Sequence, residues 1–307
     1  MKVLLATEKP FAAQAVKDIK SIIDSAGYEF ELLENYTNKK ELLQVVGEAN
    51  ALIIRSDIVD KEVLDAAPQL KTVVRAGSGY DNVDLVTAST HGVCVMNTPG
   101  QNSNAVAELV FGMLLYNLRN QFDGTTGSEL KNKKLGIYAL GNVGRNVARI
   151  AQGFQMTCFA YSRKFLGEKC NETEFGVLPV KSTEELFEIS DIVSLHMPLT
   201  TETRGCVNYN LLSRMPNNGI LVNSARKEIV VEDDLIRVME EKPNFKYFTD
   251  VMPDRDGEFA SRFGYRYFST LKKVGAQTKE ANNNAGLAAA NQVVAYLRDR
   301  IDTFRVN

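Results

Sequence analysis

Histidine and paired cysteine are both scarce in this sequence of 307 residues. The two histidines are His91 and His196, so an enzyme doing acid–base chemistry would have few imidazoles to use. The four cysteines are widely separated and form no CxxC pair, which argues against a zinc site or a disulfide framework. They are Cys94, Cys158, Cys170 and Cys206. We expect reduced thiols in the cytoplasm and no bound metal.

Long apolar runs and an excess of one charge are also missing. No apolar run approaches the roughly 20 residues of a membrane-spanning helix. The N-terminus, "MKVLLATEKPF", lacks the apolar core and cleavage site of a signal peptide. Lys and Arg number 36 against 38 Asp and Glu, a net charge of −2. This balance favours neither nucleic acid nor an anionic membrane as a partner.

What the sequence does contain is an alternation of strand-like and helix-like segments, over a length that suits two domains. Segments rich in β-formers are predicted as strands at 2–7, 28–33, 51–56, 71–76 and 93–97. After a break at Pro99 and Gly100, a long apolar helix is predicted over 103–118. Repeated strand–helix–strand units are typical of a parallel sheet with helices on both faces.

A second alternating series follows that helix. Strands are predicted at 134–140, 156–162, 191–197, 219–225, 247–251 and 265–270. The segment "STEE" at 182–185 predicts a capping box, and the residues from Thr278 to about Arg300 predict a last helix. The fold class is therefore α/β, with two doubly wound parallel-sheet domains.

A glycine-bearing turn follows the strand at 134–140 and opens a helix. Its pattern is Ala139-x-Gly141-x-x-Gly144, in which Gly141 would let the backbone approach a pyrophosphate and Gly144 would let the helix pack close to the strand. The helix N-terminus would offer N–H groups to the phosphates. Ala139 stands where the pattern has its first glycine. A tight turn without a ligand is the alternative, but the whole strand–turn–helix unit favours dinucleotide binding.

The cofactor's ribose should lie near the end of the next strand. An acidic residue there normally binds the 2′-OH of NAD. This sequence has Ser162 followed by Arg163 and Lys164, so NAD and NADP both remain open.

Four motifs in order resemble the D-isomer-specific 2-hydroxyacid dehydrogenase family: "RAGSGYDNVD" (75–84), "GNVGRNVARIAQGF" (141–154), "DIVSLHMPLTTETRG" (191–205) and "LVNSARKEIV" (221–230). Within the family, "EKPF", "MNTPGQN" and "ARKEI" are most similar to short D-3-phosphoglycerate dehydrogenases. The resemblance implies a Rossmann-type nucleotide domain, 99–281, inserted into a substrate domain made of 1–98 and 282–307. It also implies a homodimer in which the helix at 103–118 makes contacts, although a helix that is apolar all round can instead simply be buried.

The resemblance implies a role for each matching position. Arg226 would pair with the substrate carboxylate, with a surface ion pair as the alternative. Asp250 would lie near the nicotinamide, or would instead cap a turn at a strand end. His196 belongs to a loop that contacts the cofactor and is expected to be structural. The residues expected to bind the cofactor are Gly141, Asn142, Val143, Gly144, Ser162, Arg163, His196, Pro198, Ala225 and Asp250.

The sequence departs from the family at the acid–base pair. Most members use a histidine oriented by a glutamate, and here the two positions hold Lys273 and Arg255. We expect Lys273 to take the histidine's role and Lys272 to be a solvated neighbour. A free lysine has a pKa of about 10.4, so burial or nearby cations must lower it for the amine to act as a base.

Positive charge for a phosphorylated substrate is expected in the first domain. By resemblance, Arg55 would bind the phosphate, and Arg75, Gly77 and Ser78 would face the substrate. In the alternative, Arg55 pairs with Asp57 on the surface.

The leading hypothesis is NAD(P)-dependent oxidation of 3-phosphoglycerate to 3-phosphohydroxypyruvate, the first step of the phosphorylated route to serine. The alternatives are a hydroxypyruvate or glyoxylate reductase and a catalytically silent nucleotide-binding sensor. Since the sequence ends soon after the last predicted helix, we expect no added regulatory domain.

Overall fold

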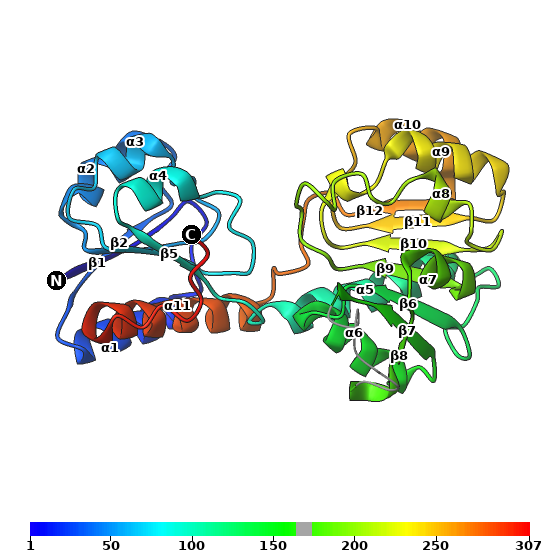
Figure 1. Ribbon diagram of the computed structural model, residues 1–307, viewed down its shortest axis with the longest axis horizontal. Helices are drawn as coiled ribbons and strands as arrows, with labels where there is room; N and C mark the ends of the chain where they lie inside the picture. Colours follow the sequence, from blue (N-terminus) through cyan, green and yellow to red (C-terminus); the bar gives the residue numbers. More distant parts are fainter. Residues whose placement is uncertain (164–173) are drawn as a thin grey trace. The chain divides into compact units, whose positions relative to one another are not determined.

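The computed structural model describes residues 1–163 and 174–307, so Lys164 and Cys170 lie outside the described residues. Contacts divide the chain into two compact units. The first unit comprises 1–102 and 277–307, and the second comprises 103–276 (Figure 1). Each unit is built around its own parallel sheet.

The first unit has a sheet in the order β2-β1-β3-β4-β5. Its strands are β1 (Lys2–Thr7), β2 (Glu29–Glu34), β3 (Ala51–Ile54), β4 (Thr72–Arg75) and β5 (Cys94–Asn97). Strands β1 and β3 are buried along nearly their whole length. This burial explains why they are continuously apolar rather than alternating, as expected for parallel strands covered on both faces.

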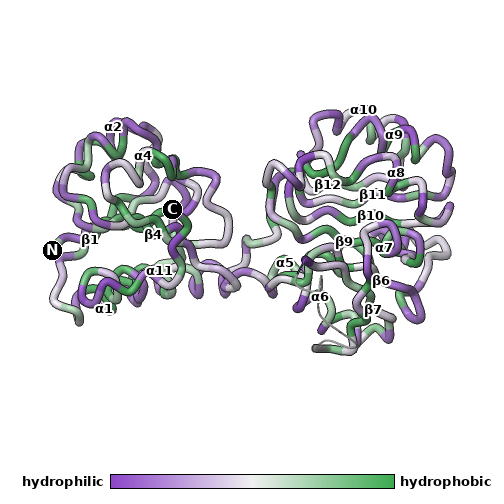
Figure 2. Tube along the Cα trace, in the orientation of Figure 1, coloured by the Kyte–Doolittle hydropathy of each residue, from purple (hydrophilic) through white to green (hydrophobic). Residues whose placement is uncertain are grey.

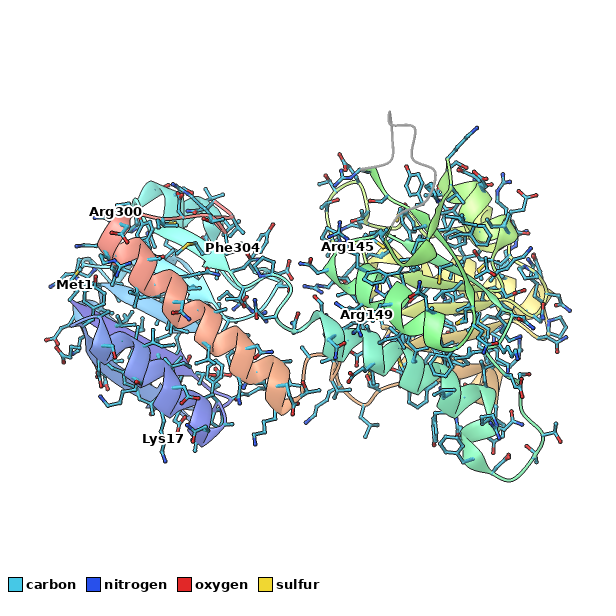
Figure 3. The ribbon with its side chains drawn as sticks, turned by 90° about the horizontal axis from the view of Figure 1, so that it is seen from below. Met1, Lys17, Arg145, Arg149, Arg300 and Phe304 are labelled. Atoms are coloured by element: carbon cyan, nitrogen blue, oxygen red, sulfur yellow. The ribbon has the colours of Figure 1, made fainter. Side chains whose placement is uncertain are left out.

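Helices cover both faces of this sheet. Helices α1 (Ala13–Ser25) and α11 (Lys279–Asp299) lie side by side on one face and form one core with it (Figure 3). Helices α2 (Lys39–Val45), α3 (Lys61–Asp65) and α4 (Leu85–Thr90) form a second core on the other face. After α11 the C-terminal tail returns to the edge strand β5, where Val306 N donates to Val95 O.

The second unit has a sheet in the order β12-β11-β10-β9-β6-β7-β8. Its strands are β6 (Lys134–Tyr138), β7 (Thr157–Tyr161), β8 (Leu178–Pro179), β9 (Ile192–Leu195), β10 (Ile220–Asn223), β11 (Lys246–Thr249) and β12 (Tyr267–Ser269). Pairing is parallel throughout the described part of the sheet. The order reverses beside β6, and α/β folds bind ligands at the carboxyl ends of strands at such a point.

Two helical layers enclose this second sheet. Helices α5 (Ser103–Leu118) and α6 (Asn142–Gly153) pack on one face. Helices α7 (Thr183–Ile189), α8 (Tyr209–Leu212), α9 (Glu232–Glu241) and α10 (Asp256–Phe263) pack on the other. Figure 2 shows hydrophobic residues gathered on the strands and hydrophilic residues toward the outside of each unit. The predicted fold class is confirmed.

The predicted strands agree with the observed ones to within two residues at either end, and α5 covers the predicted range. Strand β8 was not predicted. The capping box is wrong in one half: Ser182 Oγ accepts from Glu185 N, but the Glu185 carboxylate accepts from Lys181 N. Within 1–163 and 174–307, no helix is both long and apolar enough to cross a membrane.

The boundaries between the two units also differ from those expected after residue 98 and before residue 282. Residues 99–102 belong to the first unit, in which Asn102 Oδ1 accepts from Ser78 Oγ at 3.0 Å. At the other junction, Gln277 Oε1 accepts from Arg55 Nη2 at 3.5 Å. These contacts extend the first unit by a few residues at each junction.

Candidate active site

The glycine-bearing turn connects β6 to α6. Ala139 has φ of 77°, the left-handed conformation that glycine normally supplies at this point. An L-residue in this conformation costs about 1–2 kcal/mol. The turn therefore forms even though an alanine occupies the position of the first glycine. Ala139 N donates to Tyr161 O at 2.9 Å.

The two glycines of this turn serve different purposes. A Cβ added at Gly144 would lie 2.5 Å from Ala139 O and 3.0 Å from Ile137 Cγ2, so only glycine lets α6 pack this closely on β6. A Cβ added at Gly141 would meet no described atom within 4 Å. The space beside Gly141 is thus open to a ligand.

The first turn of α6 can donate hydrogen bonds to an anion. Gly141 is the N-cap, and no side chain among the described residues caps this helix. The first intrahelical bond runs from Arg145 N to Gly141 O, which leaves the earlier N–H groups without helical acceptors. Arg145 and Arg149 also project from α6 (Figure 3). Open space and available N–H groups beside a helix N-terminus fit a dinucleotide pyrophosphate.

His196 begins the loop after β9. Its Nδ1 lies 3.3 Å from Ser224 Oγ, and its Nε2 is buried with no hydrogen-bond partner in the part of the chain that the structure describes. Burial lowers the pKa of His196 to about 3, so the imidazole is neutral at pH 7. The loop is closed by Thr203, whose Oγ1 donates to the carbonyl of Pro198 at 2.6 Å.

Ser162 and Arg163 follow β7, where the ribose is expected. Arg163 Nη1 pairs with Glu202 Oε2 at 2.9 Å, and both side chains are exposed. Glu202 comes from the loop after His196, a partner that spacing along the sequence does not reveal. A carboxylate therefore lies beside Ser162–Arg163 even though the strand end itself carries none.

Lys273 and Arg226 converge on one backbone carbonyl. Lys273 Nζ donates to Ala225 O at 3.1 Å, and Arg226 Nη1 donates to the same oxygen at 3.0 Å. Because both groups donate to one oxygen atom, the Lys273 amine and the Arg226 guanidinium lie close together. Lys272 and Lys273 are both exposed residues, but only for Lys273 is a hydrogen bond to Ala225 O observed.

Asp250 is completely buried at the end of β11. Its Oδ1 accepts from Val274 N at 2.8 Å and from Thr270 Oγ1 at 2.9 Å, and its Oδ2 accepts from Gly275 N at 2.8 Å. The carboxylate thus binds the segment that carries Lys273, and in doing so it caps a turn after the end of a strand.

Arg255 stands where the family has its orienting glutamate. Its guanidinium forms ion pairs with Glu258 and Asp233, and its backbone N donates to Glu232 at 2.9 Å. These contacts hold the start of α10. Arg255 thus takes part in a partly exposed ion-pair cluster.

In the first unit, Arg55 follows β3 and lies partly buried. Its Nη1 donates to the carbonyls of Lys9 and Pro10 at 2.9 and 3.0 Å, and its Nη2 donates to Asn282 Oδ1 at 2.6 Å. The guanidinium also lies 4.9 Å from the ring centroid of Phe11. Burial lowers the pKa of Arg55 from its ordinary value, and the nearby Asp57 carboxylate opposes this shift.

The alternative of a surface ion pair between Arg55 and Asp57 does not describe this geometry. Asp57 is 1% exposed, and its carboxylate accepts from Arg55 N at 3.0 Å, Glu8 N at 2.6 Å and Tyr36 Oη at 2.9 Å. These donors follow three neighbouring strands. Asp57 therefore links the ends of these three strands next to Arg55. This role was not predicted from the sequence.

Arg75 ends β4, directly beside Arg55 in the sheet. Its Nε donates to Arg55 O at 2.8 Å. A Cβ added at Gly77, which has φ of +150°, would lie 1.6 Å from Arg75 Nη1, so the guanidinium rests against the glycine backbone. Ser78 O accepts from Asn97 Nδ2 at 2.7 Å. Both arginines thus lie at the carboxyl ends of adjacent parallel strands.

Within the described residues, no group of three or more His, Cys, Asp or Glu side chains could hold a metal ion.

Another residue that the sequence did not single out is Asn223. It is fully buried, accepts from Ala225 N and donates to Arg226 O, both at 3.0 Å. The signal available in the sequence was the position of Asn223 at the end of a buried strand, directly before the residues "SAR".

Known proteins resemble this chain in both sequence and fold. Residues 115–274 match the family model described as D-isomer specific 2-hydroxyacid dehydrogenase, NAD binding domain. A crystal structure of NAD⁺-bound 3-phosphoglycerate dehydrogenase from Entamoeba histolytica is 43% identical, with a TM-score of 0.91, and the match covers 100% of this chain and 98% of that one.

Curated relatives carry more than one activity. A D-3-phosphoglycerate dehydrogenase from Methanocaldococcus jannaschii is 31% identical over an alignment of 305 residues that covers 95% of this chain and 57% of that protein. This chain therefore spans a little over half the length of that relative. A hydroxypyruvate reductase from Thermotoga maritima is 31% identical over an alignment of 285 residues that covers 86% of this chain and 90% of that protein. The chain belongs to the D-isomer-specific 2-hydroxyacid dehydrogenase family.

Proposed function

We propose that this protein interconverts 3-phosphoglycerate and 3-phosphohydroxypyruvate with NAD, as a step toward serine. The observation that carries the proposal is the convergence of Lys273 Nζ and Arg226 Nη1 on Ala225 O. An amine that can move a proton then lies beside a guanidinium that can bind a carboxylate. A 2-hydroxy acid needs both groups at adjacent carbons.

The proposed roles follow from the chemistry of the two side chains. The planar fork of Arg226 pairs with the substrate carboxylate and orients the neighbouring carbon. Lys273 as a neutral amine takes the proton of the C2 hydroxyl during oxidation, and as an ammonium returns it during reduction. When bound, the nicotinamide cofactor supplies the two-electron redox chemistry at C2. Because an ordinary lysine has a pKa of about 10.4, oxidation should speed up as the pH rises.

The second unit would hold the cofactor. The N–H groups of Asn142 and Val143 would bind the pyrophosphate in the open space beside Gly141. Ser162 would face the ribose, and the Arg163–Glu202 ion pair supports NAD over NADP because Glu202 competes with a 2′-phosphate for the arginine. His196, Pro198 and Ala225 would line the rest of the site.

The first unit would bind the substrate's phosphate. Arg55 and Arg75 supply two guanidinium groups at neighbouring strand ends, with Gly77 and Ser78 beside them. Support for a phosphorylated substrate comes from relatives named as phosphoglycerate dehydrogenases. We further propose a cytoplasmic homodimer that contacts its partner through the apolar helix α5.

Hydroxypyruvate is the second candidate substrate. The Nη atoms of Arg55 already donate to Lys9 O, Pro10 O and Asn282 Oδ1, which leaves fewer of its donors for a phosphate. The hydroxypyruvate reductase of Thermotoga maritima is also as similar in sequence as the Methanocaldococcus enzyme.

The test is NADH consumption with 3-phosphohydroxypyruvate and with hydroxypyruvate at matched concentrations. We expect preference for the phosphorylated substrate, which Arg55→Ala reduces by tenfold or more. Lys273→Ala should lower kcat by about 10²–10⁴-fold, the usual contribution of acid–base catalysis, while the matched variant Lys272→Ala stays near wild type. Cofactor binding without turnover of either substrate would instead identify a silent sensor, and an unchanged kcat in Lys273→Ala would refute the proposed base.

A further inference from the structure

The buried Asp250 carboxylate is fully occupied by the loop that carries Lys273. It accepts two backbone N–H groups, from Val274 and Gly275, and the hydroxyl of Thr270. Two of these donors directly follow Lys273 in the chain. The other lies three residues before it, so the carboxylate holds the loop on both sides of the amine.

We propose that Asp250 is the positioning residue of Lys273: it holds residues 270–275 so that Nζ reaches Ala225 O. The inference rests on the proposed function, in which Lys273 moves the proton. It assigns the carboxylate to the loop, whereas family resemblance suggested a place near the nicotinamide. The side chain acts through Lys273 and touches no reacting atom.

Glycine at position 275 is a second observation that points the same way. A Cβ added there would lie 2.8 Å from Asp250 Oδ2 and 3.4 Å from Val106 Cγ2. Only glycine therefore lets the Gly275 N–H approach the carboxylate at 2.8 Å. The hydrogen bond between Gly275 N and Asp250 Oδ2 thus requires both the buried carboxylate and a glycine at position 275. The conformation of the loop therefore depends on Asp250.

An asparagine could not make the same set of bonds. Its side chain has one oxygen and one NH₂ group, while both Asp250 oxygens face backbone N–H donors. In Asp250→Asn the amide NH₂ must therefore face one of these donors. The loop should shift at that point and carry Lys273 away from Ala225 O.

The Ala225 carbonyl, which accepts the hydrogen bond from Lys273, follows β10, the strand that pairs with β11. Asn223, at the end of β10, binds the backbone of Ala225 and Arg226 through its side chain. Its carbonyl accepts from Asp250 N at 3.0 Å. Asn223 pairs with Thr249, the residue before Asp250, in the parallel register. Both loops are thus tied to adjacent strand ends, which fixes Lys273 relative to Arg226.

The test compares Asp250→Asn in the full chain with and without Lys273→Ala. We expect Asp250→Asn to lower kcat for 3-phosphohydroxypyruvate by about 10–100-fold and to leave the Kd of NADH, measured by fluorescence titration, within twofold. In the Lys273→Ala background it should cause no further loss, because a residue that acts only through Lys273 has nothing left to position. Equal losses in both backgrounds, or a Kd of NADH that rises as much as kcat falls, would overturn the inference.

A readout without turnover separates this inference from the proposed function. Acetic anhydride labelling followed by mass spectrometry should show Lys273 labelled several-fold faster in Asp250→Asn, with Lys272 as the unchanged internal control. An unchanged ratio of the two lysines would refute the positioning role. A changed ratio together with full activity of Lys273→Ala would keep the positioning role and reject the base. If Asp250→Asn does not fold, Thr270→Val removes one bond only and should give the same changes to a smaller extent.

Discussion

Replacing Gly144 by alanine tests whether close packing of α6 on β6 forms the cofactor turn. The added Cβ would lie 2.5 Å from Ala139 O and 3.0 Å from Ile137 Cγ2. Non-bonded carbon atoms are optimally placed at about 3.5–4.0 Å. One of the two obstacles is backbone, so the helix must move by an amount on the order of 1 Å.

The size of the effect follows from two opposing contributions. Overpacking of this kind costs about 1–3 kcal/mol. Alanine recovers up to about 1 kcal/mol because it is the better helix former. The net cost is therefore about 0–3 kcal/mol. For a domain of this size each kcal/mol shifts Tm by about 2–4 °C, so we expect Tm of the second unit to fall by up to about 12 °C. Since the N–H groups of Asn142 and Val143 move with the helix, NADH affinity should fall about tenfold.

The same helix provides the matched control. Gly153 ends α6, and a Cβ added there meets no described atom within 4 Å. Gly153→Ala should therefore leave Tm unchanged or raise it, with NADH binding intact. Thermal unfolding followed by circular dichroism and NADH fluorescence titration measure both quantities. If Gly144→Ala is as stable as Gly153→Ala and binds NADH equally well, the packing argument is refuted.

Two further predictions concern the substrate side and the pH response. In Gly77→Ala the new Cβ would lie 1.6 Å from Arg75 Nη1, so the guanidinium must leave and KM for 3-phosphohydroxypyruvate should rise at least tenfold. The control Gly92→Ala adds positive-φ strain in open space and should leave KM unchanged in the same steady-state assay; equal KM values in the two variants would count against the prediction. For His196, the unfolded chain takes up a proton near pH 6.5 but the folded chain only near pH 3, so stability is lost as pH falls through this window. His196→Asn should remove about 1.4 kcal/mol per pH unit from the slope of unfolding free energy between pH 6 and 4, measured by urea denaturation, and an unchanged slope would show that the imidazole is not buried neutral.

Local patterns predicted the elements of this fold well. Strand segments such as 2–7 and 134–140 were found because buried parallel strands are continuously apolar and are bounded by turn residues. Helix α5 was found from its length and its cap region. Strand β8 escaped prediction because Leu178–Pro179 is too short to show any period. The extent of each unit differs from the expected one by a few residues, because it depends on contacts between segments that are far apart in the sequence.

The candidate site was only partly visible in the sequence. Lys273 and Arg226 were identified by resemblance, but their shared acceptor, Ala225 O, depends on how β10 and β11 align. The role of Asp57 was not predictable either, because its donors follow three strands that only the fold brings together. For Asp250, turn capping was one of two expected roles, but the loop that it binds was not predicted. Spacing along a chain carries no signal for a buried carboxylate that binds backbone N–H groups of another loop.

The proposed role of Lys273 as the base offers a reason for the absence of the family's glutamate, and that reason lies in the geometry of the two kinds of base. An imidazole is planar and has two distinct nitrogens, so it must be rotated correctly and held in one tautomer by a partner such as a carboxylate. The terminal nitrogen of lysine carries equivalent hydrogens, and its position matters more than its rotation. A carboxylate that fixes the backbone of the lysine's own loop supplies such positioning, and Asp250 does this with both of its oxygens. In this proposal no orienting glutamate is needed, and Arg255 at that position pairs with Glu258 and Asp233 at the start of α10.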